Sequence, residues 1–310
     1  MELGWLEDFL ALVECTNFSR AAERRHMTQP AFSRRIRALE TWIGAALFER
    51  TSHRVAPTEA GERFRPVAEE LVRRLYQGRE EARQAQAAAA STLRFAATHA
   101  LSLTFFPAWL RSIEATARGG VVGGSAIRLV SDSMQACEQA MLQAQAEFLL
   151  CHHHPAAPPR LDPGQFRSVR IGTDRLVPLA AASGDSGRPR FALPPRAGAG
   201  AGADRPALPL LAYNPESGLG RILDAVRLVE SRSVRAEPVF ASHLAAVLRA
   251  MAQDGRGVAW LPRSLVEDDI KRGTLVPAGG EEWEVAVEIH VFRARSRQSP
   301  AAEAFWALIA

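Results

Sequence analysis

The sequence predicts an α/β protein built from an N-terminal winged helix-turn-helix, a long linker helix and a two-lobed α/β domain. Three observations predict this fold class. Two short helical patterns, a few residues apart, lie within positions 17–48, and the second has arginines on one side only. A charged helical pattern then runs from Thr58 to about Gln86. From Ser91 onward, short apolar strands alternate with helical patterns, which indicates βαβ units and a parallel sheet.

Length and composition indicate an ordinary globular protein. The 310 residues are enough for two or three domains, and 47% of them are hydrophobic and 23% charged. No apolar run reaches the roughly 18 residues that a membrane span needs, and the acidic start of the sequence is unlike a signal peptide. The cysteines, Cys15, Cys137 and Cys151, are odd in number and scattered, so no disulfide framework is expected. We therefore expect a cytoplasmic protein without a membrane partner.

The first two helices are predicted from apolar spacing and from capping residues. Apolar residues three and four apart predict an amphipathic helix over positions 3–15. A second helix should run to Arg25, with Asn17 or Ser19 as its N-cap. Residues 50–57, after the third helix, suit a small β-wing.

The third helix, over positions 29–43, separates an apolar side from a polar one. At about 100° per residue, its apolar side holds Phe32, Ile36, Leu39 and Ile43, and its polar side holds Gln29, Ser33, Arg34, Arg37 and Thr41. Thr28 is the candidate N-cap, and Pro30 is tolerated in the first turn because its missing N–H would be unpaired there. From Arg20 to Arg54 there are eight arginines against three glutamates, which is net +5 and exceeds the +4 of the whole chain.

The polar side of the third helix has the chemistry of a DNA reader. Gln29 and Ser33 can reach base edges, and a glutamine can bond an adenine with two hydrogen bonds. Arg37 can serve a guanine edge or a phosphate, and Arg34 a phosphate. The alternative is that these arginines form only a solvated face. The candidate DNA-binding residues are Ser19, Thr28, Gln29, Pro30, Ala31, Ser33, Arg34, Arg37, Arg50 and Arg54.

The long helix carries an apolar stripe. The stripe consists of Phe64, Val67, Ala68, Leu71, Leu75 and Tyr76. Pro66 lies well inside the pattern, so either the helix bends there or it starts later than Thr58. The alanine-rich positions 87–90 then form a short connector.

The remaining pattern gives two α/β sets. Strands are expected at 93–97, 126–131 and 148–151 and helices at 103–117 and 134–145 in the first set. The second set has expected strands at 166–171, 175–182, 208–213, 236–240 and 257–261 and helices at 218–231 and 244–253. A strand over 285–292 and a helix over 301–309 should return to the first lobe. Positions 183–206, which include an AGAGAGA run, are expected to form a mobile loop.

The N-terminal region resembles that of LysR-type transcriptional regulators. The matching positions are Phe9, Asn17–Ser19, Ala21–Ala22, Gln29–Ser33, Ile36, Leu39–Glu40, Ile43–Gly44, Leu47–Phe48, Arg50 and Thr58–Gly61. The resemblance implies that the third helix enters the major groove, that the wing touches the minor groove or backbone, and that the long helix dimerises antiparallel. It also implies that the connector is a hinge and that the two lobes form a periplasmic-binding-protein-like sensor domain. The expected parts are a DNA-binding domain at 1–58, a linker at 59–90 and a regulatory domain at 91–310.

Within the regulatory domain, lobe I is expected at about 91–160 and 270–310, and lobe II at about 161–269. Ligands of open α/β sheets bind beyond the carboxyl ends of strands, near helix N-termini. The candidate effector-binding residues are Thr98, His99, Ala100, Leu101, Ser102, Ser131, Asp132, Ser133, His152, Tyr213, Asn214, Ser217, Ser242 and His243. Hydroxyls and N–H groups there favour a small anion or a carboxylate, although serines at these positions also simply cap helices.

Three sensor segments look like the hypochlorite-responsive branch of the family, which is linked to methionine oxidation. The segments are FAATHALSLTFFPAWL, AYNPESGLGRIL and FASHLAAVL. This chain has Leu219 and Ser242–His243 at the matching places instead of methionine, which argues against redox sensing. Met134, Met141 and Met251 are expected in the core. Cys151 is an oxidant target only if it is exposed.

Cys151 and the three histidines that follow it also invite a metal interpretation. Consecutive residues of an extended strand alternate between faces, so the four cannot all converge on one ion. We expect neither a metal nor a cofactor, and we expect these histidines to line the crossover between the lobes.

These features favour an effector-responsive DNA-binding regulator that forms a homodimer or homotetramer. Its expected partners are double-stranded operator DNA, a small effector and, for an activator, RNA polymerase. A redox-responsive regulator that senses oxidant through methionine or cysteine is the alternative. An enzyme fused to a DNA-binding module is disfavoured because GxSxG, GxGxxG and P-loop patterns are missing. A nucleoid-type DNA binder would not need two sensor lobes.

Overall fold

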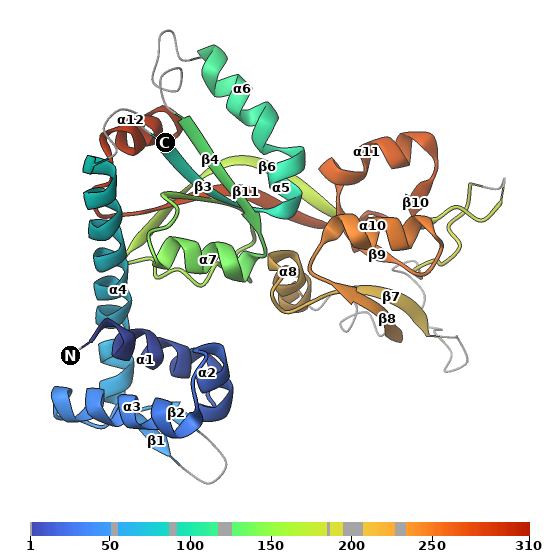
Figure 1. Ribbon diagram of the computed structural model, residues 1–310. Helices are drawn as coiled ribbons and strands as arrows, with labels where there is room; N and C mark the ends of the chain where they lie inside the picture. Colours follow the sequence, from blue (N-terminus) through green and yellow to red (C-terminus); the bar gives the residue numbers. More distant parts are fainter. Residues whose placement is uncertain are drawn as a thin grey trace. The chain divides into compact units, whose positions relative to one another are not determined.

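The computed structural model describes residues 2–50, 55–86, 92–116, 126–184, 187–194, 207–226 and 234–310. The chain divides into two compact units, Met1–Ala88 with Leu142–Gln145, and Ala89–Met141 with Ala146–Ala310. The first contains a winged helix-turn-helix and a long helix, and the second contains two α/β lobes (Figure 1). The predicted fold class is confirmed. No helix among the described residues is long and apolar enough to span a membrane.

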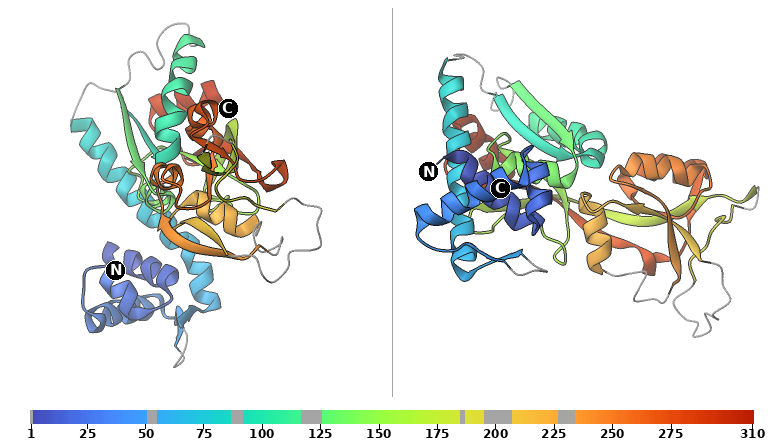
Figure 2. Two further views of the ribbon diagram at one scale, coloured as in Figure 1. Left: turned by 90° about the vertical axis from the view of Figure 1, so that its right-hand side faces the viewer. Right: turned by 60° about the horizontal axis from the view of Figure 1, so that its bottom comes forward.

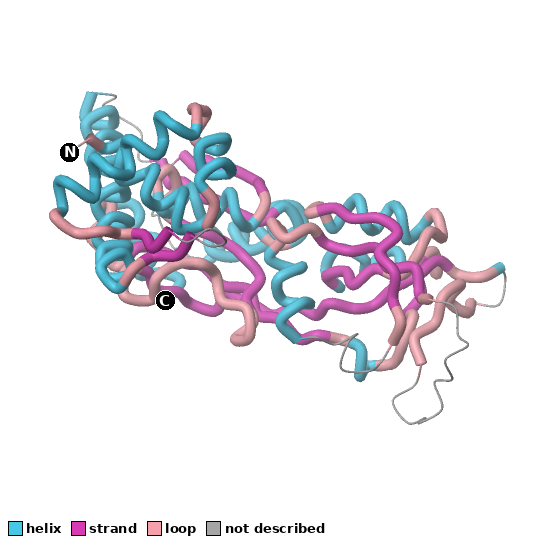
Figure 3. Tube along the Cα trace, turned by 90° about the horizontal axis from the view of Figure 1, so that it is seen from below, coloured by secondary structure: helices cyan, strands magenta, loops and turns pink. Residues whose placement is uncertain are grey.

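The N-terminal unit is mostly helical (Figure 3). Its elements are α1 (Leu3–Cys15), α2 (Phe18–Arg24), α3 (Gln29–Ile43), β1 (Phe48–Arg50), β2 (Val55–Pro57) and α4 (Glu59–Gln86). The strands β1 and β2 pair antiparallel and form the predicted wing. Asn17, and not Ser19, caps α2, because its side chain accepts a hydrogen bond from the N–H of Arg20. Thr28 occupies the N-cap position of α3, but its side chain makes no capping hydrogen bond.

A small aromatic core fixes α3 within this unit. The apolar side of α3 is fully buried at Phe32, Ile36 and Leu39, as its periodicity predicts. The ring of Phe9 in α1 lies 5.4 Å from that of Phe48 and 5.3 Å from that of Phe64. Because α1 packs against α2, α3 and α4 together, burying one side of α3 leaves its other side facing outward.

The helix α4 begins where the sequence predicts. The hydroxyl of Thr58 accepts a hydrogen bond from the N–H of Gly61 at 3.1 Å, and Pro66 lies inside the helix. A later start is therefore excluded, and Pro66 interrupts the backbone hydrogen bonding of the helix because it has no N–H. The residues of the predicted apolar stripe divide into a packed group and an exposed group. Phe64, Ala68 and Tyr76 pack on the N-terminal core, whereas Val67, Leu71 and Leu75 are 49%, 43% and 54% exposed.

A seven-stranded sheet forms the framework of the larger unit, in the order β10-β6-β11-β5-β3-β4 with β9 paired to β6. These strands are β3 (Thr92–Thr98), β4 (Ala126–Asp132), β5 (Phe148–His153), β6 (Phe166–Ala181), β9 (Ala259–Pro262), β10 (Leu275–Pro277) and β11 (Val285–Ala294). The pairs of β3 with β4 and with β5 are parallel, as predicted, whereas β11 and β6 run antiparallel to their neighbours.

Helices cover both faces of the sheet in lobe I (Figure 1). They are α5 (His99–Thr104), α6 (Phe106–Thr116), α7 (Met134–Leu142) and α12 (Pro300–Ile309). The sequence predicted one helix over 103–117; the structure has two that meet at Phe105, and the predicted helix over 134–145 ends at Leu142. In the core of this lobe, the Phe95 ring stacks on that of Phe148, and the Phe305 ring contacts both of them edge-on. The C-terminal helix therefore packs back on lobe I as predicted.

Lobe II is built around the ends of β6 and β11 that lie opposite to lobe I (Figure 2), and it has its own core. Its further elements are β7 (Leu208–Tyr213), α8 (Gly218–Val226), β8 (Ala236–Ser242), α10 (Ala245–Gln253), α11 (Arg263–Arg272) and η2 (Glu281–Trp283). The strands β7 and β8 pair in parallel. Residues 263–277, which the sequence left unassigned, form α11 and β10, and the predicted helix over 218–231 is described only as far as Val226.

Two strands carry the chain between the lobes. The sequence predicted separate strands at 166–171 and 175–182, but β6 is continuous because it pairs with β11 along that length. A Cβ at Gly172 would lie 3.0 Å from the ring of Phe105, so this glycine leaves room for that ring, and the register shifts beside it. On β11, Val287 belongs to the lobe II core and Ile289 to the lobe I core. This crossing lies well beyond the expected lobe boundary near residue 270.

Candidate functional site

The exposed side of α3 brings together the predicted DNA-contacting side chains. Gln29, Pro30, Arg34 and Arg37 are exposed, and Ala31 and Ser33 are partly buried beside them. Ser19 and Thr28 are also exposed. The side chain of Arg50 and all of Arg54 lie outside the described residues. The α3 surface is therefore polar and cationic over its N-terminal turns, where unpaired backbone N–H groups also point outward.

Ion pairs sort the arginines of this unit into two groups. Arg25 pairs with Glu7 and Asp8, and Arg35 pairs with the fully buried carboxylate of Asp8 at 3.0 Å. Arg24 pairs with Glu14. By contrast, neither Arg34 nor Arg37 has an ion pair with a described residue. The first group anchors α2 and α3 to α1, and the second has its charge available to an anionic partner.

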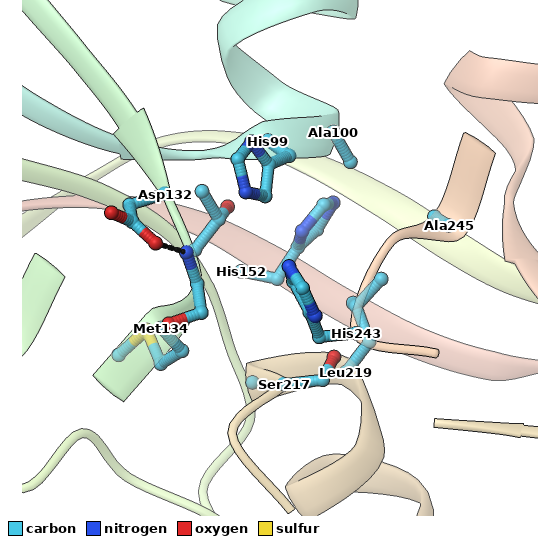
Figure 4. A pocket seen from close by; sticks show the side chains of 12 residues that line it. His99, Ala100, Asp132, Met134, His152, Ser217, Leu219, His243 and Ala245 are labelled. Atoms are coloured by element: carbon cyan, nitrogen blue, oxygen red, sulfur yellow. Dashed lines mark hydrogen bonds between the residues drawn. The ribbon is translucent and has the colours of Figure 1, made fainter. Parts of the chain in front are cut away.

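A cavity of about 30 Å³ lies between the two lobes (Figure 4). Lobe I contributes the end of β3, the starts of α5 and α7, and β5; lobe II contributes the starts of α8 and α10. The cavity is lined by Thr98, His99, Ala100, Asp132, Ser133, Met134, His152, Ser217, Gly218, Leu219, His243 and Ala245. Eight of the candidate effector residues therefore meet at one place, as the strand-end argument predicts.

Three histidines from different elements face one another here (Figure 4). The rings of His99 and His243 have centroids 5.7 Å apart. Burial lowers the pKa of His99, with Asp132 opposing this change and His243 adding to it. His152 is almost fully buried, and its Nε2 lies 3.5 Å from a carboxylate oxygen of Asp174. At neutral pH the His99 ring is therefore neutral, and its N–H can serve as a donor.

A hydroxyl pair lies next to the histidines. Ser131 contacts Ser102, with the two hydroxyl oxygens 2.7 Å apart, and its hydroxyl lies 3.0 Å from Nδ1 of His99. The hydroxyl of Ser102 also donates to the carbonyl of His99 at 2.9 Å. These contacts set the orientation of the His99 ring. Within the cavity, the hydroxyl of Thr98 is buried without a hydrogen-bond partner among the described residues.

Ser133 and Ser217 at the cavity, and Ser242 near it, have the capping role that serines commonly take at helix starts. The hydroxyl of Ser133 accepts a hydrogen bond from the N–H of Ala136, and that of Ser217 from the N–H of Gly220. Ser242 accepts from the N–H of Leu244. Capping and ligand binding are compatible, because a capping oxygen keeps its own O–H for another acceptor.

Six candidate residues are not among those that line the cavity. Leu101 is fully buried in the lobe I core, and the hydroxyl of Tyr213 donates to the carbonyl of Trp260. Burial raises the pKa of Tyr213. Asn214 and Ser242 join the ends of β7 and β8 through a backbone hydrogen bond, and Ser102 with Ser131 lies behind His99.

Sequence reasoning missed the residues that close the cavity. Met134 was expected only in the core; it is 3% exposed and yet lines the cavity, where a Cβ at Gly218 would lie 3.1 Å from its Cγ. Nearby, Arg221 of α8 pairs with Glu138 of α7. No local pattern reveals such contacts, because the partners come from separate lobes.

The cysteines of the regulatory domain do not fit an oxidant sensor. Cys151 is fully buried and burial raises its pKa, so the exposure that an oxidant target needs is missing there. Cys137 is buried too, and its pKa is raised to about 12, mainly by burial. A protonated, buried thiol is a poor nucleophile.

Comparison with known families decides the class of protein. Residues 3–62 match the family described as "Bacterial regulatory helix-turn-helix protein, lysR family", and residues 86–310 match the "LysR substrate binding domain". The chain belongs to the LysR family. It is therefore a DNA-binding transcriptional regulator with an effector-binding domain, as the N-terminal resemblance predicted.

Individual LysR-family relatives align with almost the whole length of this chain. The HTH-type transcriptional regulator YjiE of Escherichia coli K12 is 30% identical over 99% of this chain and 93% of its own length. HypT from Salmonella typhimurium, a hypochlorite-specific LysR-type regulator, is 29% identical with a TM-score of 0.56, covering 99% of this chain and 96% of its own. DarR of Vibrio fischeri, solved in complex with DNA, is 28% identical with a TM-score of 0.55, covering 100% and 98%. These relatives are transcriptional regulators.

Proposed function

We propose that this regulator reads operator DNA with the exposed side of α3. The observation that carries the proposal is that Arg34 and Arg37 are exposed on the same side as Gln29 and pair with no described acid, whereas Arg24, Arg25 and Arg35 are held by acids of α1. Gln29 and Ser33 would contact base edges and Arg34 a phosphate. Ser19, Thr28, Pro30, Ala31 and the wing arginines Arg50 and Arg54 would complete the interface.

The test is binding to the promoter region of the regulator's own gene in a gel shift, with random DNA as competitor. Gln29→Ala and Arg37→Ala should each weaken operator binding by about 1–3 kcal/mol, with the oligomer intact. Arg63→Ala is the matched control, because Arg63 is an exposed arginine of α4 that pairs with Glu59. Wild-type binding by both α3 variants would contradict the assignment of α3, and equal binding to any DNA would favour a nonspecific DNA binder.

The proposal includes a homodimer or homotetramer assembled through α4. Val67, Leu71 and Leu75 repeat every four residues and form an exposed apolar stripe, which is the pattern of a helix that pairs with another helix. Two recognition helices would then face two half-sites of a palindromic operator. RNA polymerase would be a further partner if the regulator is an activator.

For the effector, we propose a small anion held by the histidines and hydroxyls of the cavity. A volume of about 30 Å³ suits one or two water-sized groups, whereas pockets for drug-sized ligands measure about 300–1,000 Å³. A halide, a small oxyanion or the carboxylate end of a longer molecule fits this size. The N–H groups at the starts of α5, α7, α8 and α10 would add favourable dipoles.

A thermal-shift series with halides, nitrate, formate and larger carboxylates tests the effector class. The smallest anions should raise the melting temperature of the wild-type chain, and His99→Gln should lose the effect. Ser102→Ala should weaken it, because Ser102 orients His99 through Ser131. Equal stabilisation of the wild type and of both variants would contradict a cavity site.

Oxidant sensing is a second candidate, favoured by the position of Met134 at the cavity. A molecule as small as hypochlorous acid would reach its thioether, and HypT is a hypochlorite-specific relative. Met134→Leu, a swap of similar volume, should abolish an oxidant-dependent change in operator binding while leaving the anion response in place. An oxidant response that persists in this variant would remove Met134 as the sensor.

A further inference from the structure

A cluster of metal-ligating side chains lies outside the cavity, on the strands β5 and β11. His153 is directly opposite Glu288 in the antiparallel pairing, and His290 follows two residues later, so all three side chains point to the same face. Nδ1 of His153 lies 3.6 Å from Oε2 of Glu288, and Nε2 of His290 lies 2.8 Å from the same oxygen. All three ligand atoms lie within 4.8 Å of one another.

These separations match the spacing of ligands around one ion. Nitrogen and oxygen ligands of tetrahedral zinc, about 2.0–2.1 Å from the ion, lie roughly 3.4 Å from each other. The two measured separations fall on either side of this value. Small rotations of the stacked His153 and His290 rings, whose centroids are 4.3 Å apart, would equalise them.

The contacts of His153 and His290 leave one imidazole nitrogen of each ring available to a metal ion. Nδ1 of His153 is buried without a hydrogen-bond partner among the described residues, which is costly unless another group satisfies it. Nδ1 of His290 lies 3.1 Å from the hydroxyl of Ser168. A donor bond from Nδ1 to Ser168 would leave the Nε2 lone pair for the ion, as second-shell partners of metal-bound histidines do.

An ion can reach the cluster from solvent, and one carboxylate oxygen of Glu288 is not paired with Arg170. His153 and Glu288 line an open cavity of about 750 Å³, through which an ion and its waters can enter. Arg170 pairs with the other carboxylate oxygen, Oε1, at 3.2 Å, and leaves Oε2 for the ion. The Arg170 charge opposes a bound cation, so removing it should strengthen metal binding.

We propose that His153, Glu288 and His290 form a binding site for a divalent transition-metal ion of the Zn²⁺ class. Two imidazoles and one carboxylate are ligands that zinc accepts, and three protein ligands leave the fourth position to water. The site lies where β11 passes between the lobes, because Val287 belongs to the lobe II core and Ile289 to the lobe I core. A bound ion would tie β5 to this crossing and restrict the relative motion of the lobes.

The experiment measures Zn²⁺ binding to the full chain after treatment with a chelator and dialysis, in competition with a chromogenic chelator. The wild type should bind one Zn²⁺ per chain. His153→Gln, Glu288→Gln and His290→Gln should each lower the affinity by more than about tenfold, since loss of a second-shell partner alone costs 10–100-fold. Arg170→Gln should raise the affinity. Bound Co²⁺ should give the strong visible absorption of a tetrahedral site in the wild type and not in His290→Gln.

Matched histidine variants separate this site from the effector cavity. His99→Gln and His243→Gln remove imidazoles from the cavity and should leave Zn²⁺ binding unchanged. Zn²⁺ should also raise the melting temperature of the wild type and of these controls, but not of His290→Gln. No stoichiometric Zn²⁺ in the wild type, wild-type affinity in His290→Gln, or loss of binding in the cavity variants would each overturn the proposal.

Discussion

Arg221 of α8 and Glu138 of α7 form a bidentate ion pair that joins the two lobes. Nη1 of Arg221 donates to Oε1 of Glu138 at 2.7 Å, and Nη2 donates to Oε2 at 3.0 Å. The side chains are 15% and 3% exposed. The backbone N–H of Arg160 donates to the same carboxylate. Because the pair is buried and fully hydrogen-bonded, it favours the arrangement in which the lobes enclose the cavity.

Arg221→Met should therefore loosen the lobes. The substitution leaves the Glu138 carboxylate buried without its partner, which costs on the order of 3–5 kcal/mol. Opening the lobes would relieve much of that cost by hydrating Glu138. Hydrogen exchange of the α7 and α8 amides should become faster, and small-angle scattering should show a larger radius of gyration. Arg175→Met is the control, since it breaks only an exposed pair with Glu284. Unchanged exchange in Arg221→Met would show that the pair does not hold the lobes.

Local signals explain why the N-terminal unit was predictable. The bounds of α1 and α3 follow from apolar periodicity and from a Gly C-cap at Gly44, all of which act within a few residues. The start of α4 at Thr58 is local too. Which arginines pair with acids was not predictable, because the answer depends on acids such as Asp8, whose contact with Arg35 spans 27 positions of sequence.

The regulatory domain shows the limit of the same reasoning. Strand ends and helix starts identified candidate residues for the cavity, and eight of these candidates line it. The continuity of β6 was missed because pairing with β11, more than 100 residues away, overrides the local signal at Gly172. The Arg221–Glu138 pair and the His153–Glu288–His290 cluster likewise arise from long-range pairing. Alternation along β5 argues against one site made of four consecutive residues, but it could not identify partners on another strand.

Substituting Arg35 should lower the stability of the fold, whereas substituting Arg37, two residues away, should weaken operator binding. Arg35→Ala removes a partner of the buried Asp8 carboxylate and should lower the free energy of unfolding by on the order of 1–3 kcal/mol. Arg37→Ala removes an exposed side chain and should leave the unfolding free energy within about 0.5 kcal/mol of wild type, while operator binding weakens. Urea unfolding and gel shifts on the same two proteins check this. Equal stability losses would contradict the division of the arginines.

Charge on the α4 stripe should reduce oligomerisation. Burying a leucine at an interface contributes about 1.5–3 kcal/mol, so Leu71→Glu or Leu75→Glu should weaken the assembly by more than about tenfold. Sedimentation equilibrium over a range of protein concentrations measures the change. Leu308→Glu is the control, because Leu308 is 45% exposed on α12 and does not belong to the stripe. If the α4 variants keep the wild-type mass at every concentration, another surface makes the interface.

Anion binding to the cavity should strengthen as the pH falls. Burial lowers the pKa of His99, so without a ligand the folded state resists its protonation and loses stability as the pH falls below the unfolded value of about 6.5. A bound anion favours the imidazolium, so binding takes up a proton. The anion-induced rise in melting temperature should be larger at pH 6 than at pH 8, and His99→Gln should flatten this dependence. His26→Asn, at an exposed turn with φ of 54°, should keep it. An equal rise at both pH values in the wild type would contradict proton uptake by His99.

Glu303 should make the stability of lobe I sensitive to acid. Hydrogen bonds from the buried guanidinium of Arg293, opposed by burial and helped by the N–H of Gln298, lower the pKa of Glu303 to about 2. A carboxyl with a lowered pKa stabilises the fold above its unfolded value, near 4.5, and that contribution disappears as the pH falls toward 2. Glu303→Gln should thus be less stable than the wild type at pH 7, and the difference should shrink below pH 4.5. Urea unfolding at pH 7, 5, 4 and 3 measures this difference, and a gap that stays constant with pH would show that the Glu303 charge does not stabilise lobe I.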